Sequence, residues 1–211
     1  MKGEHILTGT AGAYFVMHRL AIEGFHASAT HGNAPCVDIL ACSETGGKSV
    51  AIQVKTTKNA TRFAGRGQAR QVAYLDFPLS KDVATVGQPS APLITFVDLR
   101  IYPGVKTNTP DVYIYPVAKV RAAFDQTKVG LSPMVRFLPR IADAEKYKNR
   151  WNLIARHLSE EVLPADTDDV EFVRLFDDAG KPFWYPKPLT KAGESVAAGF
   201  AQDASRVWPA S

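Results

Sequence analysis

Two β-rich runs joined by a pair of glycines constrain the fold of this chain more than any other part of it. The runs are VDILACSE at 37–44 and KSVAIQVKTT at 48–57. Gly46 and Gly47 lie between them. Glycine adopts positive φ angles without steric cost, so a glycine pair between two such runs is typical of a tight β-hairpin. The sequence therefore predicts two antiparallel strands side by side.

The polar residues of this hairpin come together at one end of it. In the second run branched aliphatic residues alternate with others, in the order Val50, Ala51, Ile52, Gln53, Val54, Lys55. Gln53 and Lys55 therefore point to one face of the strand and the aliphatic residues to the other. Asp38 lies at the start of the first run, so the hairpin brings Asp38, Gln53 and Lys55 to one end of the sheet.

These residue types suit metal-dependent chemistry on phosphate esters. The Asp38 carboxylate and the Gln53 amide oxygen can hold a hard cation such as Mg²⁺ or Mn²⁺, with the Val54 carbonyl as a further ligand. The Lys55 ammonium can orient an attacking water or stabilise negative charge that develops on a phosphate. Taken singly, an aspartate at a strand end and a lysine on a strand are more often structural or solvated residues. Their shared position favours a functional site.

The segments around the hairpin complete an alternating α/β pattern. A first helix is expected over residues 8–23, with Thr8 or Thr10 as its cap and Gly24 closing it. The other expected elements are a short strand in 24–32, a buried strand in 91–101, a strand followed by a helix in 110–124, and a helix from Tyr147 to Leu158.

Charge divides the chain into two parts. The 211 residues carry a net charge of +4, but residues 1–160 hold 20 Lys or Arg against 12 Asp or Glu, whereas residues 161–211 hold 5 against 9. A basic domain favours a polyanionic partner, most simply nucleic acid, although a solvated basic surface is the alternative. The Pro-containing acidic part is predicted to be a C-terminal extension with a β-hairpin that turns at 178–180 and a helix over about 190–205.

A run of bases without acids follows the predicted site. From Thr45 to Leu75 there are six Lys or Arg residues and no Asp or Glu. The last four of these bases are Lys58, Arg62, Arg66 and Arg70. Gly65 and Gly67 disfavour a helix here, so residues 58–71 are predicted to form a mobile basic loop. We expect its four bases to contact the phosphates of a bound nucleic acid.

Several classes of protein are disfavoured by what the chain lacks. No apolar run reaches the roughly 18 residues that span a bilayer, so no membrane contact is expected. The first residues lack the basic-then-apolar order of a secretion signal. Cys36 and Cys42 are too few for a disulfide framework. A cytoplasmic protein with free thiols is the expectation.

The order of these features resembles the PD-(D/E)XK nuclease superfamily. A first helix, then Asp38, then a hairpin that carries Gln53-Val54-Lys55 corresponds to its D and [D/E/Q]-x-K motif. Five stretches look most like those of a group of small, largely uncharacterised bacterial members: GTAGAYFVMHRLAIEGFHAS, VDILACSETGGKSVAIQVKT, LITFVDLR, PDVYIYPVAKV and YKNRWNLI.

The resemblance covers about residues 6–158 and implies a fold and an activity. The fold is an α/β restriction-endonuclease-like core in the order α-β-β-β-α-β, with a mixed central sheet flanked by helices. Residues 1–160 would form this domain and residues 161–211 the extension. The activity is Mg²⁺-dependent hydrolysis of DNA phosphodiester bonds, with Asp38, Gln53 and Lys55 as catalytic residues. The resemblance also makes a homodimer the expected assembly.

Two departures from the superfamily pattern bear on activity. Gln53 stands where the commonest form has an acid, and a neutral amide binds Mg²⁺ more weakly than a carboxylate. Ala13 stands where many relatives have a glutamate in the first helix, and Glu4 and Glu23 are the acids that could replace it. A second hypothesis is therefore a catalytically degenerate nuclease fold. Such a protein would act as a DNA-binding or protein-interaction module, for example in phage defence or counter-defence.

Overall fold

A computed structural model places most of the chain in two compact units, Met1–Leu163 and Pro164–Ser211. It describes residues 2–30, 37–65, 71–81, 83, 91–102, 109–125, 134–159, 170–176 and 182–188. Within these ranges no helix is both long enough and apolar enough to cross a membrane.

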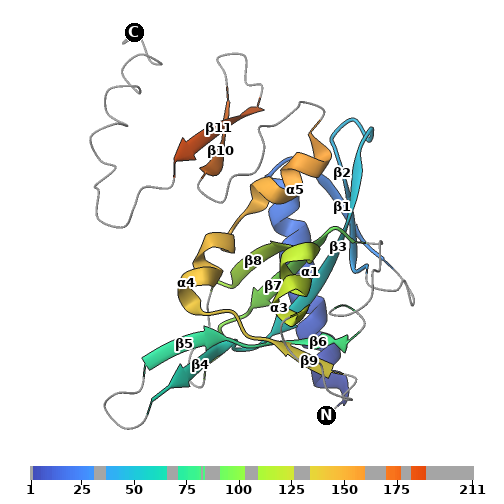
Figure 1. Cartoon of the computed structure of the whole chain (residues 1–211). Coiled ribbons are helices and arrows are strands. Elements are labelled where there is room, and N and C mark those ends of the chain that lie inside the picture. The colour runs from blue at the N-terminus through green and yellow to red at the C-terminus, as the bar shows by residue number, and fades with distance from the viewer. Residues whose placement is uncertain are drawn as a thin grey trace. The chain divides into compact units, whose positions relative to one another are not determined.

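The first unit is built on a five-stranded mixed sheet in the order β1-β2-β3-β7-β8 (Figure 1). The strands are β1 (His26–Ala29), β2 (Ile39–Cys42), β3 (Ser49–Thr57), β7 (Leu93–Asp98) and β8 (Asp111–Pro116). β3 and β7 are parallel, and the other neighbouring strands are antiparallel. Helices flank this sheet, so the predicted α/β fold with a mixed central sheet is confirmed.

The glycine pair forms the predicted hairpin between β2 and β3. Gly46 has a φ of +76°, a conformation that residues with a side chain rarely adopt. Its backbone N–H donates to the Ser43 carbonyl at 2.9 Å, and the Ser43 N–H donates to the Lys48 carbonyl at 2.9 Å. These bonds fix the register in which Ile39 faces Ile52.

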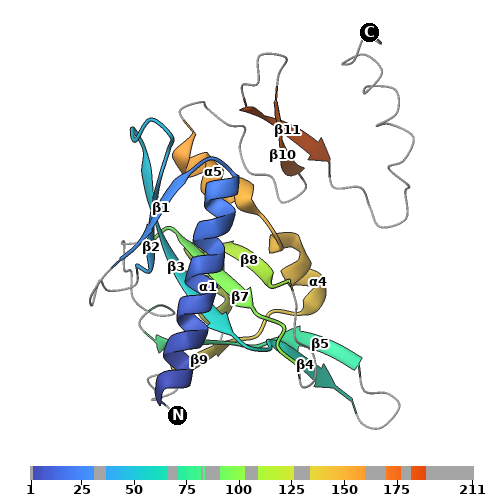
Figure 2. The same ribbon diagram turned by 180° about the vertical axis from the view of Figure 1, so that it is seen from behind.

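One face of the sheet packs against α1 (Lys2–Ile22) and α5 (Trp151–Leu158). Figure 2 shows α1 crossing in front of the strands on this side. Val16 and Leu20 of α1 are fully buried in a cluster that includes Ile52 and Val54 of β3. The helix ends as predicted at Gly24, whose φ is +82°.

The first helix begins earlier than the sequence indicated. It starts at Lys2, so Thr8 and Thr10 lie within the helix and do not cap it. Lysine, glutamate and leucine are good helix formers, and they extend the helix through residues 2–7 without a threonine cap.

Gly12 is the point where α1 lies closest to the sheet. A Cβ atom built at this position would overlap the side chain of Thr56 in β3. Only glycine therefore lets the helix approach the strand this closely. Substitution of Gly12 by any larger residue would push α1 away from β3.

The other face of the sheet is covered by a second apolar cluster rich in aromatic rings. The covering elements are β6 (Phe77–Ser80), α3 (Val117–Asp125), β9 (Met134–Phe137), α4 (Ile141–Ala144) and the 3-10 helix η2 (Glu145–Tyr147). β6 and β9 pair with each other in an antiparallel ribbon. Between these two clusters every residue of β7 is buried, as the apolar run predicted.

The expectation of a basic loop over 58–71 is wrong for part of this segment. β4 (Thr61–Ala64) and β5 (Gln71–Leu75) pair in an antiparallel ribbon that extends away from the end of the central sheet (Figures 1 and 2). Thr61 faces Leu75 and Phe63 faces Val72. Cross-strand pairing outweighs the weak local preferences of this polar, glycine-bearing sequence.

The helix predicted from Tyr147 to Leu158 begins only at Trp151. Asn149 has a φ of +54°, which a helix cannot accommodate, and it separates η2 from α5. The residue before it, Lys148, instead forms a β-bridge with Tyr113.

The described part of the second unit is an antiparallel β-hairpin of β10 (Val170–Phe176) and β11 (Pro182–Pro188). Val173 faces Tyr185 at its centre. The hairpin agrees with the sequence prediction. The turn predicted at 178–180 and the helix predicted over 190–205 lie outside the described residues.

Candidate active site

Asp38 extends the pairing of β2 with β3 through its side chain. Its backbone N–H donates to the Ile52 carbonyl, and its own carbonyl accepts from the Thr30 N–H, each at 3.0 Å. Because the Asp38 backbone carbonyl accepts from Thr30, the Asp38 carboxylate is the group that accepts a hydrogen bond from β3. The Val54 N–H donates to Asp38 Oδ2 at 2.7 Å. The carboxylate therefore lies directly against the backbone between Gln53 and Lys55.

Gln53 and Lys55 lie on the sheet face opposite α1, as their alternation predicted. Gln53 is 4% exposed, and Lys55 is partly buried. In the parallel register Gln53 pairs with Ile94 and Lys55 with Phe96. Within the described part of the chain, the Lys55 ammonium has no hydrogen bond or ion pair. The structure thus brings together the three predicted residues, and among the described residues none neutralises the Lys55 ammonium.

The residues around Asp38 fit a hard cation that keeps most of its water. Asp38 Oδ2 is already used by Val54, and Oδ1 makes no contact of this kind with a described residue. Asp38 Oδ1, the Gln53 amide oxygen and the Val54 carbonyl are all oxygen donors of the kind that Mg²⁺ prefers. The described residues hold no group of three or more His, Cys, Asp or Glu side chains suited to a metal. Among the described residues, Asp38 is the carboxylate that such a metal would use.

The first helix adds no acid to this site in the described residues. Ala13, at the position where many members of the superfamily carry glutamate, packs beside the apolar cluster under α1. Glu23 forms an ion pair with Arg19 one turn away, at 3.6 Å. The side chain of Glu4 lies outside the described part of the structure.

Arg62 forms a salt bridge with Asp76. Its Nε donates to Asp76 Oδ2 at 3.0 Å, and Arg136 Nε donates to Asp76 Oδ1 at 2.6 Å. A second Arg136 nitrogen also donates to Oδ2. Burial alone would raise the pKa of the Asp76 carboxyl, but the hydrogen bonds and charges of Arg136 and Arg62 outweigh burial and lower it. We call these three residues the Asp76 cluster.

The other predicted phosphate contacts are only partly described. Lys58 lies just beyond β3 and lines a pocket of about 350 Å³ together with His5 and Thr8 of α1. Arg66 and Arg70 lie outside the described residues. Lys58, which is exposed just beyond β3, stays a predicted phosphate contact.

Asp98 is a buried acid that the sequence reasoning missed. It ends β7 at 2% exposure, accepts from the Arg100 N–H at 2.9 Å and faces Asp111 of β8. Burial and the neighbouring Asp111 raise the pKa of the Asp98 carboxyl, although two backbone hydrogen bonds oppose them. Strand geometry puts its Cα roughly 8 Å from that of Lys55. The available signal was an acid at the end of an otherwise buried apolar strand.

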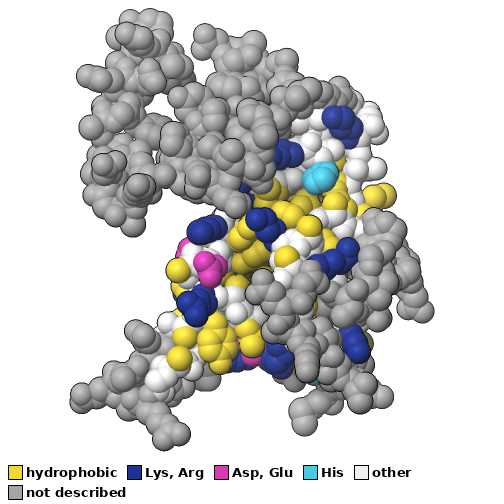
Figure 3. Space-filling view, viewed as in Figure 1, with side chains coloured by type: hydrophobic (Ala, Val, Ile, Leu, Met, Phe, Trp, Pro, Cys, Tyr) yellow, Lys and Arg dark blue, Asp and Glu magenta, His cyan; other side chains and the backbone are white. Residues whose placement is uncertain are grey.

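Basic side chains are scattered over the described surface on the side of α3 and β9. Figure 3 shows Lys and Arg spread across this view, with acidic side chains at few places. Two of the acids that are present, Asp76 and Asp111, already form ion pairs with Arg or Lys. The surface therefore keeps a positive potential that suits a polyanion.

Comparison with known proteins gives little further guidance. No family model and no curated protein matches the sequence. Among solved structures, the chain is similar to a bacterial homing endonuclease, I-Ssp6803I, with 13% identity and a TM-score of 0.40. The match covers 71% of this chain and 91% of that chain. A likeness this distant transfers no role to any residue of this chain.

Proposed function

We propose that this protein is a metal-dependent nuclease of the PD-(D/E)XK type that hydrolyses phosphodiester bonds in DNA. The observation that carries the proposal is the junction of β2 and β3. There the Asp38 carboxylate lies on the Val54 N–H, between the buried Gln53 and Lys55, which forms no ion pair with a described residue. A carboxylate, an amide and a lysine gathered at one end of the sheet suit the binding of a metal ion and a phosphate.

Each residue has a distinct task in this proposal. Asp38 and Gln53 would hold Mg²⁺ or Mn²⁺, with the Val54 carbonyl beside them. When bound, the ion polarises a phosphate oxygen and lowers the pKa of a coordinated water. Lys55 places a positive charge where negative charge develops on the phosphate. Lys58 and the basic surface would hold the nucleic acid backbone through its phosphates.

The test is a cleavage assay that separates the charge of Asp38 from its hydrogen bond. Asp38→Asn keeps an oxygen that can accept from the Val54 N–H but loses the negative charge. Supercoiled plasmid, linear duplex and single-stranded DNA are incubated with Mg²⁺, Mn²⁺ or EDTA. We expect metal-dependent cutting by the parent protein and none by Asp38→Asn at equal melting temperature. Cutting that persists in EDTA, or equally in the variant, would refute the assignment.

A second candidate function rests on the single carboxylate. A protein with Gln53 and Ala13 in place of acids would keep the fold and bind DNA or a protein without cutting it. Under this alternative neither Mg²⁺ nor Mn²⁺ shifts the melting temperature, and no DNA substrate is cut. DNA binding that weakens steeply with salt would then identify nucleic acid as the partner. Salt-independent capture of a protein would identify an interaction module.

A further inference from the structure

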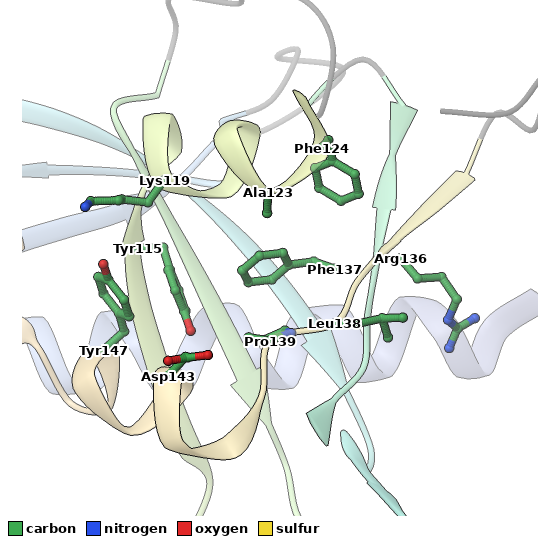
Figure 4. Close-up of a pocket in the computed structure, with 10 residues that line it drawn as sticks. All are labelled: Tyr115, Lys119, Ala123, Phe124, Arg136, Phe137, Leu138, Pro139, Asp143 and Tyr147. Carbon is green, nitrogen blue, oxygen red and sulfur yellow. The ribbon is translucent and has the colours of Figure 1, made fainter. Parts of the chain in front are cut away.

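A pocket of about 440 Å³ opens on the face of the sheet that carries α3 and β9 (Figure 4). Its walls come from β8, α3, β9 and the α4–η2 segment, so it shares no residue with the Asp38 site. The volume is within the range of small-molecule sites. The residues that matter below are Tyr115, Lys119, Phe124, Phe137, Asp143 and Tyr147.

Aromatic rings form the walls of this pocket. Tyr115 and Tyr147 stack with their centroids 4.0 Å apart and an interplanar angle of 24°. Phe137 meets Tyr115 edge-on at 5.2 Å, and Phe124 lies 6.4 Å from Phe137. Flat apolar surfaces at fixed angles favour a planar ring as ligand, because stacking adds to the gain from burial.

The Tyr115 hydroxyl is a polar group without a partner. Tyr115 is 4% exposed, and its buried oxygen has no hydrogen-bond partner in the part of the chain that the structure describes. Burial raises the pKa of this hydroxyl, so it keeps its proton at neutral pH and can donate. Figure 4 shows it turned toward the side of the pocket that holds Asp143. A buried hydroxyl left unpaired costs free energy, which a ligand with a matching acceptor would recover.

Opposite charges stand at the edge of the pocket. Lys119 and Asp143 both line it and are both exposed. Figure 4 shows them on different elements, Lys119 on α3 and Asp143 on α4. Arg136 also lines the pocket, but its guanidinium is committed to Asp76. Lys119 also lines the pocket, and its exposed side chain can reach an anionic group of a ligand.

We propose that this pocket binds a single nucleotide unit, a nucleobase with its attached phosphate. The base would stack among the aromatic rings and accept a hydrogen bond from the Tyr115 hydroxyl. The phosphate would lie beside Lys119, and Asp143 would accept from an exocyclic amine or a sugar hydroxyl. A nucleotide supplies all three groups in one molecule. The proposal does not depend on cleavage, because none of these residues belongs to the Asp38 site.

The nucleotide could be free or part of a strand, and the sheet register makes both sources reasonable. Tyr115 pairs with Ile94, and Ile94 pairs with Gln53, so the three residues form one row across β8, β7 and β3. The pocket and Gln53 are therefore on the same face, two strands apart, or roughly 10 Å between Cα atoms. An unstacked base of a strand that passes Asp38 would have only this distance to span.

Calorimetric titration of the full chain tests the proposal. The probes are the four nucleoside monophosphates, the matching nucleosides, inorganic phosphate and a short single-stranded oligonucleotide. Tyr115→Phe removes only the unpaired hydroxyl and should leave the melting temperature equal or higher. It should weaken mononucleotide binding about three- to tenfold. Lys119→Ala should weaken mononucleotides by a similar factor but leave nucleoside affinity unchanged.

The matched control is Lys146→Ala, an exposed lysine of η2 outside the pocket, which should change no affinity. No binding of any mononucleotide at millimolar concentration would overturn the proposal, and so would unchanged affinity in both pocket variants. Mononucleotides that displace the oligonucleotide would identify a base of a strand as the occupant. Mononucleotides that bind without displacing it would identify a free nucleotide.

Discussion

Two charged clusters in the first unit differ in how completely their charges are paired. In the Asp76 cluster, one buried carboxylate accepts from two arginines through both of its oxygens. At the junction of β2 and β3, Asp38 accepts one backbone N–H, and Lys55 meets no counter-charge in the described residues. Asp76 is buried, whereas Asp38 and Lys55 are partly buried.

The difference indicates which cluster has capacity left for a ligand. A carboxylate that already accepts from two guanidinium groups has little capacity for a further ligand, and it connects β4 and β9 to the residue between β5 and β6. A lysine such as Lys55, which has no hydrogen bond or ion pair with a described residue, can meet the charge of a substrate. We therefore expect charged residues that are paired within the chain to stabilise the fold, and unpaired ones to act on the substrate. The following substitutions test this expectation.

The largest expected effect is the loss of cleavage in Lys55→Ala. If Lys55 stabilises charge on the phosphate, its removal should slow cutting about 100- to 1,000-fold. The free energy of unfolding should change by less than about 0.5 kcal/mol, since no partner is left unpaired. Plasmid cleavage under single-turnover conditions and urea unfolding measure the two quantities.

Lys48→Ala, on the same hairpin, is the control for this change. Lys48 donates to the Ser159 carbonyl, and its loss should alter neither the cleavage rate nor the affinity for DNA by more than about twofold. A Lys55→Ala protein that cuts at the rate of the parent would show that the unpaired charge is not catalytic.

Asp76→Ala should show the opposite profile. Two arginines would lose their common acceptor, but both are partly exposed and can turn to solvent, with side chains 39% and 56% exposed. The expected loss of unfolding free energy is therefore about 1–3 kcal/mol, below the full cost of breaking a buried pair. Cleavage well below the melting temperature should be unchanged. Glu145→Ala, an exposed acid, should cost less than about 0.5 kcal/mol.

The pH dependence of stability distinguishes paired from unfavourably buried carboxyls, because the pKa values of Asp76 and Asp98 are shifted in opposite directions. The pKa of Asp76 is below its ordinary value of 3.8, so its stabilisation is present above that pH and is lost as the pH falls further. The pKa of Asp98 is above the same value, so its stabilising term is present at low pH and is lost as the pH rises through the folded pKa.

Asp76→Asn and Asp98→Asn measure how much each carboxyl contributes to the pH dependence of the unfolding free energy. Urea unfolding over the range from about pH 3 to pH 7 should show a smaller acid loss in Asp76→Asn than in the parent. In the parent, the unfolding free energy should decline as the pH rises above the ordinary carboxyl pKa, and Asp98→Asn should remove this decline. Equal pH profiles for the two variants would contradict the assignment of Asp76 as paired and Asp98 as unfavourably buried.

The sequence predicted the position of the candidate site more successfully than it predicted which basic residues are available to contact phosphate. Alternation in β3 and the glycine pair determine which residues meet across a hairpin, and these are local features. Arg62 was assigned to phosphate because the run from Thr45 to Leu75 holds no acid. Its partner, Asp76, is the next residue after that run, and Arg136 comes from a strand 60 residues away. Charge counted along the chain does not reveal such cross-strand pairs.

The same reasoning explains why Asp98 was missed. Its strand was predicted as buried from its apolar composition, but burial of the last residue depends on what packs over the end of the sheet. The Ala60 N–H donates to Asp98, and Asp111 faces it from β8. Both partners come from segments distant in sequence, so the raised pKa follows from the fold and not from the strand itself.

The smallest expected effect compares two bases that the sequence treated alike, Lys58 and Arg62. Lys58→Ala should weaken DNA binding a few-fold and reduce the slope of log affinity against log salt by about one. Arg62→Lys keeps the charge but loses the guanidinium geometry toward Asp76. It should cost about 0.5–1 kcal/mol of stability and leave the salt slope unchanged. Fluorescence anisotropy at several salt concentrations, beside urea unfolding, gives both quantities. A reduced salt slope in Arg62→Lys would mean that Arg62 contacts phosphate despite its pairing, and pairing within the chain would then fail as a guide to function.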